Sequence, residues 1–116
     1  MATACLFLGF DAPRPGCEKD AFPHLMGSLL TELDSFKTEG WFESYEMFGL
    51  TPHCGNLNIG VLIKGERAKL DELRRSDRFE RVSMQLGRLF TGYGVIPGVT
   101  LEGMRKVADR NPDLLK

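Results

Sequence analysis

His53 is the residue of this sequence best suited to proton transfer, because imidazole exchanges protons close to neutral pH. It stands beside Cys54 in the turn-like segment TPHCGN, residues 51–56. A Cys–His pair can also form a nucleophile, but neighbouring residues of a turn rarely point at each other as that chemistry requires. We therefore treat His53 as a candidate acid–base residue, with an ordinary turn residue as the alternative.

Three more residues carry side chains that can exchange a proton. Asp11 follows the first apolar run and is either a base at the mouth of a pocket or a turn residue before Ala-Pro. Tyr45 and Tyr93 belong, with Trp41 and Phe48, to a set of aromatic residues that can line a pocket between a sheet and helices. The same aromatic residues can simply fill the core, which is their commoner fate. Asp11, Tyr45 and Tyr93 join the histidine above as candidate catalytic residues.

Four arginines lie close together in one segment: Arg74, Arg75, Arg78 and Arg81. Arginine can bind a carboxylate or a phosphate through two parallel hydrogen bonds, so this cluster is the candidate anion-binding site. The favoured interpretation is nevertheless a solvated helix face, because acidic residues stand at spacings that allow ion pairs along a helix: Asp71, Glu72, Asp77 and Glu80. Residues 1–63 have 3 basic and 8 acidic residues, whereas residues 64–116 have 12 basic and 8 acidic ones. Positive charge is thus concentrated in the half that holds these arginines, which keeps the anion-binding hypothesis open.

We expect neither a metal nor a cofactor. A metal ion needs three or four His, Cys, Asp or Glu side chains that converge, and His24 and His53 are far apart in the sequence. His24 lies off the apolar stripe of its predicted helix, so we expect it to be solvated. The glycines of GYGVIP, residues 92–97, lie in a predicted strand instead of between a strand and a helix, which argues against a dinucleotide loop. Haem ligation by a histidine remains an alternative that no motif favours.

Composition narrows the class of protein. The net charge of −1 over 116 residues argues against a nucleic-acid partner bound through bulk charge. Three widely spaced cysteines match neither a disulfide framework nor a CxxC site, which indicates a reducing compartment. No apolar run reaches the roughly 18 residues of a membrane helix, and no basic residue precedes the first apolar run as in a secretory signal. We therefore expect a single cytoplasmic domain over residues 1–116 with no membrane partner.

The first half of the hydrophobic pattern predicts a strand and a helix. The apolar run Ala4–Phe10 is typical of a strand that is covered on both faces. Apolar residues at three- and four-residue spacing predict a helix over residues 22–36. Asp20 suits its N-cap, Pro23 falls in its first turn, and Gly40 follows its end.

The second half predicts a hairpin, two helices and a last strand. Residues 41–50 and 57–64 are rich in aromatic, β-branched and aliphatic residues and predict two antiparallel strands joined by a turn. Residues 66–90 predict two helices, because the apolar stripe changes phase, and Ser76 suits the N-cap of the second one. A last strand over residues 91–100 ends in a threonine that can cap a short final helix.

This order of elements is typical of the ferredoxin-like βαββαβ fold, an α+β arrangement with a four-stranded antiparallel sheet and helices on one face. In a monomer the other face would carry polar side chains in clean alternation. Here Leu6 and Leu8 lie on one side of the first strand and Cys5 and Phe7 on the other. Because a large apolar surface usually marks a partner, we predict a homodimer whose two sheets pack face to face.

Four segments together resemble the dimeric α+β barrel superfamily. They are the first strand with its Pro/Gly-rich loop, the hairpin around TPHCGNLN, the segment GERAKLDELRRSDRFERV and the closing GYGVIPGVTLEGM. Within that superfamily the chain is similar to a small bacterial family of uncharacterised function. The resemblance implies a dimeric α+β barrel, whose members include cofactor-free monooxygenases, haem-degrading and haem-binding enzymes, muconolactone-type isomerases and stress-responsive proteins. One fold serves all of these, so it does not decide the function.

Two hypotheses of different class follow. In the first, each subunit holds a small apolar pocket between sheet and helices and binds or modifies a small organic molecule there, by cofactor-free oxidation or isomerisation if it is an enzyme. In the second, the protein is a non-catalytic stress or assembly module that acts through its dimer interface. A concave site between sheet and helices would favour the first hypothesis.

Overall fold

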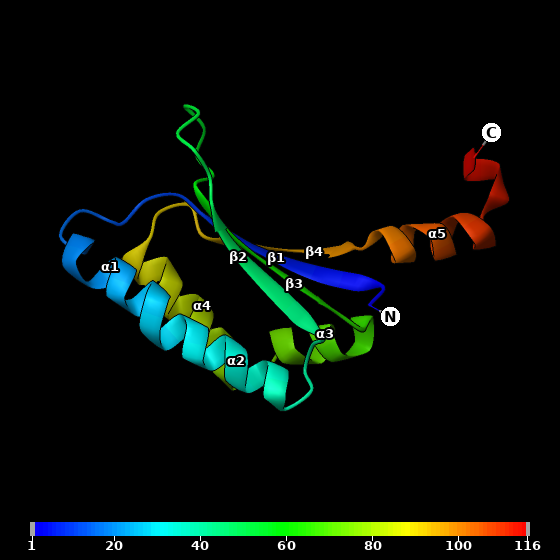
Figure 1. The fold of residues 1–116 in the computed structure, drawn as a ribbon, viewed down its shortest axis with the longest axis horizontal. Coiled ribbons are helices and arrows are strands. Elements are labelled where there is room, and N and C mark those ends of the chain that lie inside the picture. The colour runs from blue at the N-terminus through cyan, green and yellow to red at the C-terminus, as the bar shows by residue number, and fades with distance from the viewer. Residues whose placement is uncertain (1, 116) are drawn as a thin grey trace.

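The fold is built on one antiparallel sheet (Figure 1). The computed structural model describes residues 2–115, and its strands are hydrogen-bonded in the order β2-β3-β1-β4. The strands are β1 Ala4–Phe10, β2 Ser44–Gly49, β3 Ile59–Gly65 and β4 Gly94–Val99. The helical elements are α1 Glu18–His24, the π-helical segment η1 Leu25–Leu29, α2 Leu30–Thr38, α3 Arg67–Arg74, α4 Asp77–Leu89, α5 Leu101–Arg110 and the 3-10 turn η2 Pro112–Leu115.

Helices cover one face of the sheet and leave the other open. In Figure 1, helices α1 to α4 lie below the sheet, whereas α5 and the connection between β2 and β3 extend away from it. All three strand pairs are antiparallel, and the order of elements is that of the predicted ferredoxin-like fold with an extra C-terminal helix. The predicted fold class is therefore confirmed.

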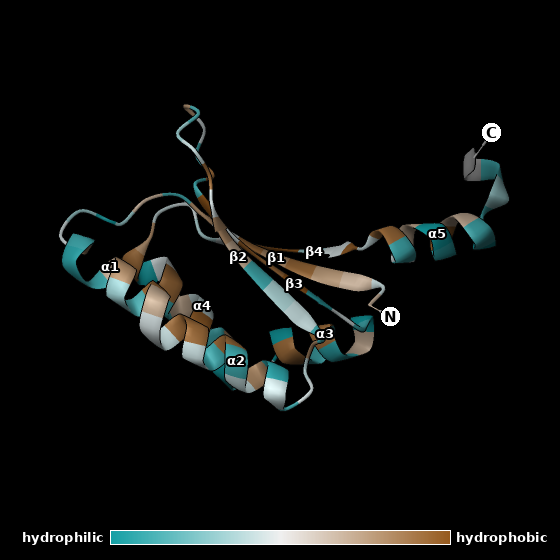
Figure 2. Ribbon diagram, viewed as in Figure 1, coloured by the Kyte–Doolittle hydropathy of each residue, from teal (hydrophilic) through white to brown (hydrophobic). Residues whose placement is uncertain are grey.

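The central strand β1 carries apolar side chains on both of its faces. Leu6, Leu8 and Phe10 point to the helices and are fully buried. Cys5 and Phe7 alternate with them, point to the open face and are half-buried. Figure 2 accordingly shows β1 in the colours of hydrophobic residues along most of its length. The predicted failure of clean alternation is confirmed.

The helical layer begins with the continuous run α1–η1–α2. Its side chains buried against the sheet are Leu25, Leu29, Leu33 and Phe36. The run begins at Glu18, because the N–H of Ala21 already donates to the carbonyl oxygen of Cys17 at 2.9 Å. The prediction that Asp20 is the N-cap is therefore wrong. Asp20 lies in the first turn, where the helix dipole favours a carboxylate.

Pro23 lies inside this run and not in its first turn, contrary to the prediction. Proline has no N–H to donate within a helix, and its ring crowds the carbonyl four residues earlier. Soon after it the backbone changes to the π-helical turn of η1. The predicted apolar stripe is not buried as a whole, since Phe22 and Met26 are 50% and 65% exposed.

Gly40 ends the helix α2 as predicted. Its φ of +88° lies in the left-handed region that glycine adopts without strain. Its N–H donates to the carbonyl of Lys37, and the N–H of Trp41 donates to that of Phe36, both at 3.0 Å. These two bonds make a Schellman motif, which satisfies carbonyl groups that the helix end would leave unpaired.

Two hydroxyl groups cap the later helices, also as predicted. Ser76 accepts a hydrogen bond from the N–H of Phe79 at 3.2 Å and starts α4. Thr100 accepts one from the N–H of Gly103 at 3.1 Å and starts α5. A Cβ added to Gly103 would lie 2.0 Å from the carbonyl oxygen of Thr3. This close backbone contact fixes the direction in which α5 leaves the sheet.

Three strands are shorter than predicted. β2 starts at Ser44 instead of residue 41, because Phe42 belongs to a connection that closes the core and is only 4% exposed. β3 starts at Ile59, and the hairpin connection before it is correspondingly longer. β4 starts at Gly94, after Gly92 has turned the chain with a φ of +68°.

Two glycines of neighbouring strands lie side by side on the open face. Gly9 and Gly60 are partners in the β1–β3 register. A Cβ added to Gly60 would lie 2.7 Å from the ring of Phe48 and 2.9 Å from the ring of Phe7. The two rings, whose centroids are 6.1 Å apart, therefore lie across the glycines and cover backbone that has no side chain of its own.

We predict that Gly60→Ala lowers the free energy of unfolding by about 1–3 kcal/mol, because the new methyl group must displace Phe7 and Phe48. Gly94→Ala is the matched control, since a Cβ at Gly94 meets open space. Urea unfolding of both variants at one protein concentration measures the difference. Equal stability of the two variants would contradict this account of the open face.

Candidate functional site

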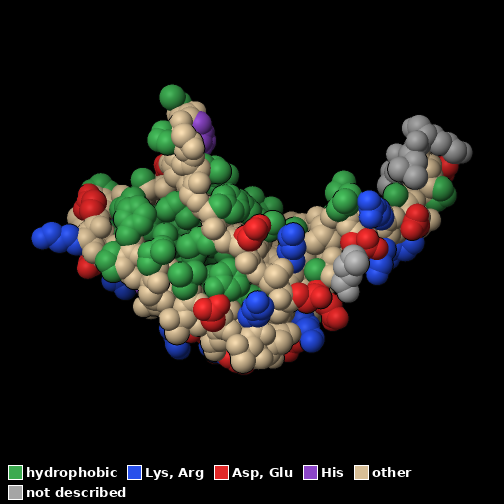
Figure 3. All heavy atoms as spheres, in the orientation of Figure 1, with side chains coloured by type: hydrophobic (Ala, Val, Ile, Leu, Met, Phe, Trp, Pro, Cys, Tyr) green, Lys and Arg blue, Asp and Glu red, His purple; other side chains and the backbone are tan. Residues whose placement is uncertain are grey.

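An apolar groove lies between the helical run and the β2–β3 hairpin. Its volume is about 440 Å³. The helical run contributes Phe22, Leu25, Met26 and Leu30, and the hairpin contributes Met47, Phe48, Gly49 and Ile59. In Figure 3 hydrophobic side chains gather in a broad patch where α1 faces β2. This is the concave site between sheet and helices that the first hypothesis requires.

The absence of a side chain at Gly49 leaves the space that forms the groove. Gly49 pairs with Ile59 and lies on the strand face that points to the helices. A Cβ added there would have no heavy atom within 4 Å, so the space above it is empty. On the opposite wall Phe22 is held edge-on against Phe90, with ring centroids 6.3 Å apart. The wall at Phe22 is thus packed against the core, whereas no side chain fills the floor of the groove at Gly49.

The described residues that line this groove are all apolar or glycine. Tyr45 is the predicted catalytic residue placed nearest to it by the strand register, because it shares a face of β2 with Met47. Its hydroxyl donates a hydrogen bond to Oδ1 of Asp34 at 2.6 Å. This bond to the carboxylate raises the pKa of Tyr45 to about 12. Tyr45 is therefore a hydrogen-bond donor at neutral pH and not a base.

Asp11 and Tyr93 contact other parts of the molecule. Asp11 accepts a short hydrogen bond from the side-chain amide of Asn58, which joins the end of β1 to the start of β3. The hydroxyl of Tyr93 lies 2.7 Å from that of Ser83 on α4, and burial raises the pKa of Tyr93. Neither residue lines the apolar groove.

His53 lies in the exposed connection between β2 and β3, and both of its ring nitrogens bind that connection. Nδ1 accepts from the N–H of Gly55 at 3.2 Å, so the proton is on Nε2, which donates to the carbonyl of Leu57 at 2.7 Å. Cys54 has a φ of +66° and is exposed. A haem iron or a proton acceptor would have to displace one of these bonds, which hold the loop together.

Of the four predicted arginines, Arg78 is the one that forms an ion pair within the described residues. Arg78 is bound between helices: it pairs with Glu32 at 3.0 Å and with Glu39 at 2.8 Å, and it stacks on the ring of Phe36 at 4.5 Å. Its hydrogen bond to Glu39 lowers the pKa of that carboxyl group. Arg74, Arg75 and Arg81 are exposed. Arg78 thus pairs with acidic residues of the neighbouring helical run, and not with the acidic residues of its own segment that the prediction named.

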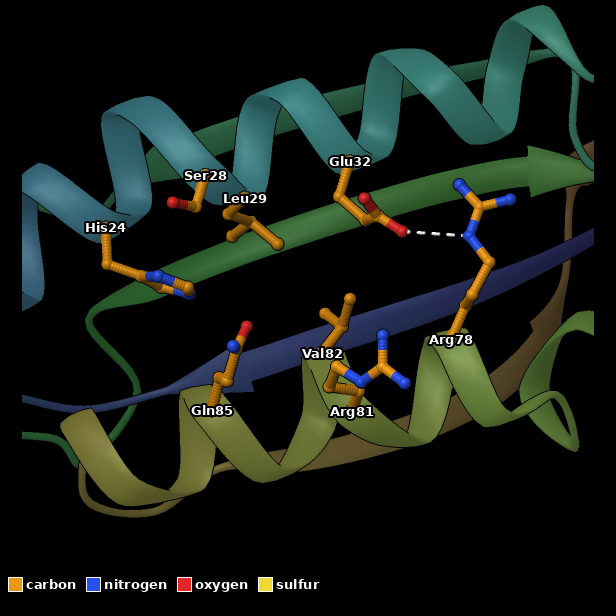
Figure 4. A pocket seen from close by; sticks show the side chains of 8 residues that line it. All are labelled: His24, Ser28, Leu29, Glu32, Arg78, Arg81, Val82 and Gln85. Carbon is orange, nitrogen blue, oxygen red and sulfur yellow. Dashed lines mark hydrogen bonds and ion pairs between the residues drawn. The ribbon is translucent and has the colours of Figure 1, made fainter.

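A second, polar cleft lies between the α1–η1–α2 run and α4 (Figure 4). Its volume is about 170 Å³, and its lining includes Ser28, Arg81 and Gln85. His24 also points into this cleft, and its Nε2 is buried without a hydrogen-bond partner among the described residues. The expectation that His24 is solvated therefore holds only in part, because the residue is half-buried and its Nε2 is out of contact with water. Spacing along one helix places it off the apolar stripe, but only the packing of the helices buries this nitrogen.

Neither a metal cluster nor a membrane helix is found between residues 2 and 115. No three His, Cys, Asp or Glu side chains in this range come close enough together to bind one ion. None of the helices formed by these residues combines the length and the apolar character needed to span a bilayer.

The protein resembles known proteins in structure and not in sequence. No protein-family model and no curated protein matches the sequence. Solved structures do match. An ethyl tert-butyl ether D (EthD) family protein from Bacillus halodurans C-125 superposes with a TM-score of 0.63 at 13% identity, over 85% of this chain and 99% of that one. A dimeric protein of unknown function with a ferredoxin-like fold, from Bacteroides fragilis NCTC 9343, gives 0.60 at 8% identity over 86% and 98%.

The fold is ferredoxin-like. A third structure, a conserved protein from Methanosarcina mazei Go1, agrees with a TM-score of 0.54 at 18% identity, over 83% of this chain and 91% of that one. The fold predicted from the sequence is thereby confirmed. At such low identity these neighbours carry no residue assignment, so the candidate site depends on the geometry described above.

The Tyr45–Asp34 pair gives a direct prediction. In Tyr93→Phe, which has a single tyrosine, the ultraviolet absorbance of tyrosinate should titrate with a midpoint of about 12, against an ordinary value of 10.0. Replacing Asp34 by Ala should return the midpoint towards 10.0. Because the raised pKa belongs to the folded state, the contribution of this bond to stability is complete below pH 10 and is lost as the pH rises towards 12. An unchanged midpoint in the Asp34 variant would contradict the assignment.

Proposed function

We propose that this protein binds a small apolar organic molecule in the groove between the helical run and the β2–β3 hairpin. The observation that carries the proposal is the 440 Å³ volume with an apolar lining and an empty floor over Gly49. Binding sites for small molecules are concave, mainly apolar and in the range of a few hundred Å³. The groove satisfies these three conditions.

The exposed side chains on the helical wall support the same proposal. Phe22 and Met26 keep half or more of their surface in contact with water, which is costly for residues of their size. Methionine adapts its shape easily and is common at surfaces that bind apolar partners. The name of the Bacillus halodurans neighbour refers to ethyl tert-butyl ether, which is a small apolar compound of the kind that such a groove suits.

If the ligand is modified, the groove offers few groups for the reaction. Of the four predicted catalytic residues, Tyr45 is the one on the strand face that also carries Met47 of the lining. Its hydroxyl donates its proton to Asp34, so it would orient the ligand by accepting a hydrogen bond from a polar group of the ligand. Cofactor-free oxidation or isomerisation in this groove would therefore depend on Tyr45 for positioning.

We further propose that two copies associate through the open face of the sheet. Phe7 and Leu62 lie on this face, and Ile96, which is 62% exposed, lies beside them on β4. The open face is the concave side of the molecule between the β2–β3 connection and α5 in Figure 3. Two further apolar residues of α5, Leu101 and Met104, are 63% and 57% exposed. The dimeric state named for the Bacteroides fragilis neighbour supports this association.

A second candidate function is assembly alone, as a module without a ligand. The apolar open face favours it, because that face would serve association equally well if the groove stayed empty. The two candidates differ only in what the groove does, so substitutions in the groove distinguish them.

We predict that Gly49→Leu weakens binding of a neutral apolar probe, N-phenyl-naphthylamine, at least about tenfold, because the new side chain occupies the floor of the groove. Gly27→Leu is the matched control, since Gly27 is an exposed residue of η1 with open space around it and does not line the groove. Fluorescence titration measures both affinities. Equal binding by wild type and Gly49→Leu would overturn the proposed site and favour assembly alone.

We predict that the wild-type protein sediments at micromolar concentration as twice 13.0 kDa and that Leu62→Glu sediments as 13.0 kDa. A second carboxylate beside Glu46, the cross-strand neighbour of this residue, cannot be buried between two sheets without a partner. Met84→Glu, on an exposed part of α4, should keep the dimer. A 13.0 kDa wild-type species, or a dimer that persists in a folded Leu62→Glu variant, would contradict association through this face.

A further inference from the structure

The polar cleft on the outer side of the helical layer is separate from the apolar groove. Figure 4 shows His24 and Ser28 on the first helical run facing Arg81 and Gln85 on α4 across it. The cleft of 170 Å³ is followed along the same helix pair by a second hollow of about 300 Å³, and both are lined by His24 and Gln85. These two residues thus lie where the two hollows adjoin.

One ring nitrogen of the half-buried His24 has no hydrogen-bond partner among the described residues. Its Nε2 has almost no contact with solvent and no hydrogen bond in the described chain. Leaving such an atom unpaired costs free energy, so unpaired buried nitrogens are rare and each one needs an explanation. Burial also lowers the pKa of His24, so the ring is neutral when the cleft is empty at neutral pH.

Arg81 supplies an uncommitted positive charge next to this histidine. The other arginine of the cleft, Arg78, is already neutralised by Glu32 and Glu39. Arg81 has no ion pair within the described part of the chain, although it lines the same cleft. The neighbouring hollow is balanced, because its lining has one acid and one base, Asp20 and Arg88.

Size and shape limit what can bind. Leu29 and Val82 give the cleft an apolar side, while Ser28 and Gln85 add a hydroxyl and an amide. Ser28 belongs to the π-helical segment, and such segments are frequent at ligand sites. One free positive charge with Glu32 close by suits a single negative charge and disfavours a doubly charged phosphate.

We propose that this cleft binds a small monocarboxylate, with Arg81 holding the carboxylate, His24 and Gln85 donating hydrogen bonds to it, and Leu29 and Val82 contacting its hydrocarbon part. This site does not depend on the function proposed for the apolar groove. Carboxylate binding brings a negative charge to His24 and so stabilises the protonated ring. The charged groups that line the two hollows together with His24 are Asp20 on its own helix, Glu32 on α2, and Arg78, Arg81 and Arg88 on α4.

The test is an NMR titration of the two histidine rings with sodium propionate, against sodium chloride at the same ionic strength. His53→Gln assigns the two signals, and in the wild type His53 serves as internal control because it lies in the exposed loop. Propionate should raise the titration midpoint of His24 by about one pH unit and leave that of His53 in place. No change at His24, or an equal change at both histidines, would overturn the proposal.

Variants make the test specific. Arg81→Gln should abolish the response of His24, whereas Arg75→Gln, which removes an exposed arginine that does not line the cleft, should retain it. Inorganic phosphate should produce a smaller shift than propionate, and a larger one would overturn the choice of a monocarboxylate. Gly49→Leu should respond to propionate like wild type, so failure of this site and failure of the apolar groove can be told apart.

Discussion

A strand with apolar side chains on both sides needs cover on both sides, and β1 has helices on only one of them. Leu6, Leu8 and Phe10 are fully buried under the helical layer. On the open face Phe7 and its neighbours are covered only by their own rings, which lie across the glycines of β1 and β3. The proposed association of two copies would cover this second face. Because the direction of α5 is fixed, further apolar side chains lie at the edge of the open face.

The helical layer has two sides of different chemistry. Towards the sheet and the β2–β3 hairpin it leaves an apolar groove, and between its own helices it leaves a polar cleft. Arg78 holds the two helices in place, since it binds Glu32 and Glu39 and stacks on Phe36. The hydrogen bond from Arg78 lowers the pKa of Glu39, so this ion pair persists below neutral pH.

Local rules explain which parts of the fold could be predicted. The caps at Ser76 and Thr100 and the Schellman glycine Gly40 depend on a few neighbouring residues, and all three are found where the sequence indicates them. The start of the first helix is different. Asp20 has a side chain that suits an N-cap. The helix nevertheless begins at Glu18, because the N–H of Ala21 already donates to the carbonyl of Cys17.

The sequence by itself determined that the sheet has two apolar faces, because alternation along a strand assigns each side chain to a face. It also determined the order of elements and therefore the ferredoxin-like topology. Only the tertiary structure decided which polar groups come together: Tyr45 donates to Asp34, and His24 and Gln85 line one cleft from two helices. The reason is that alternation and helical periodicity are local, whereas the meeting of side chains from distant elements depends on how those elements pack.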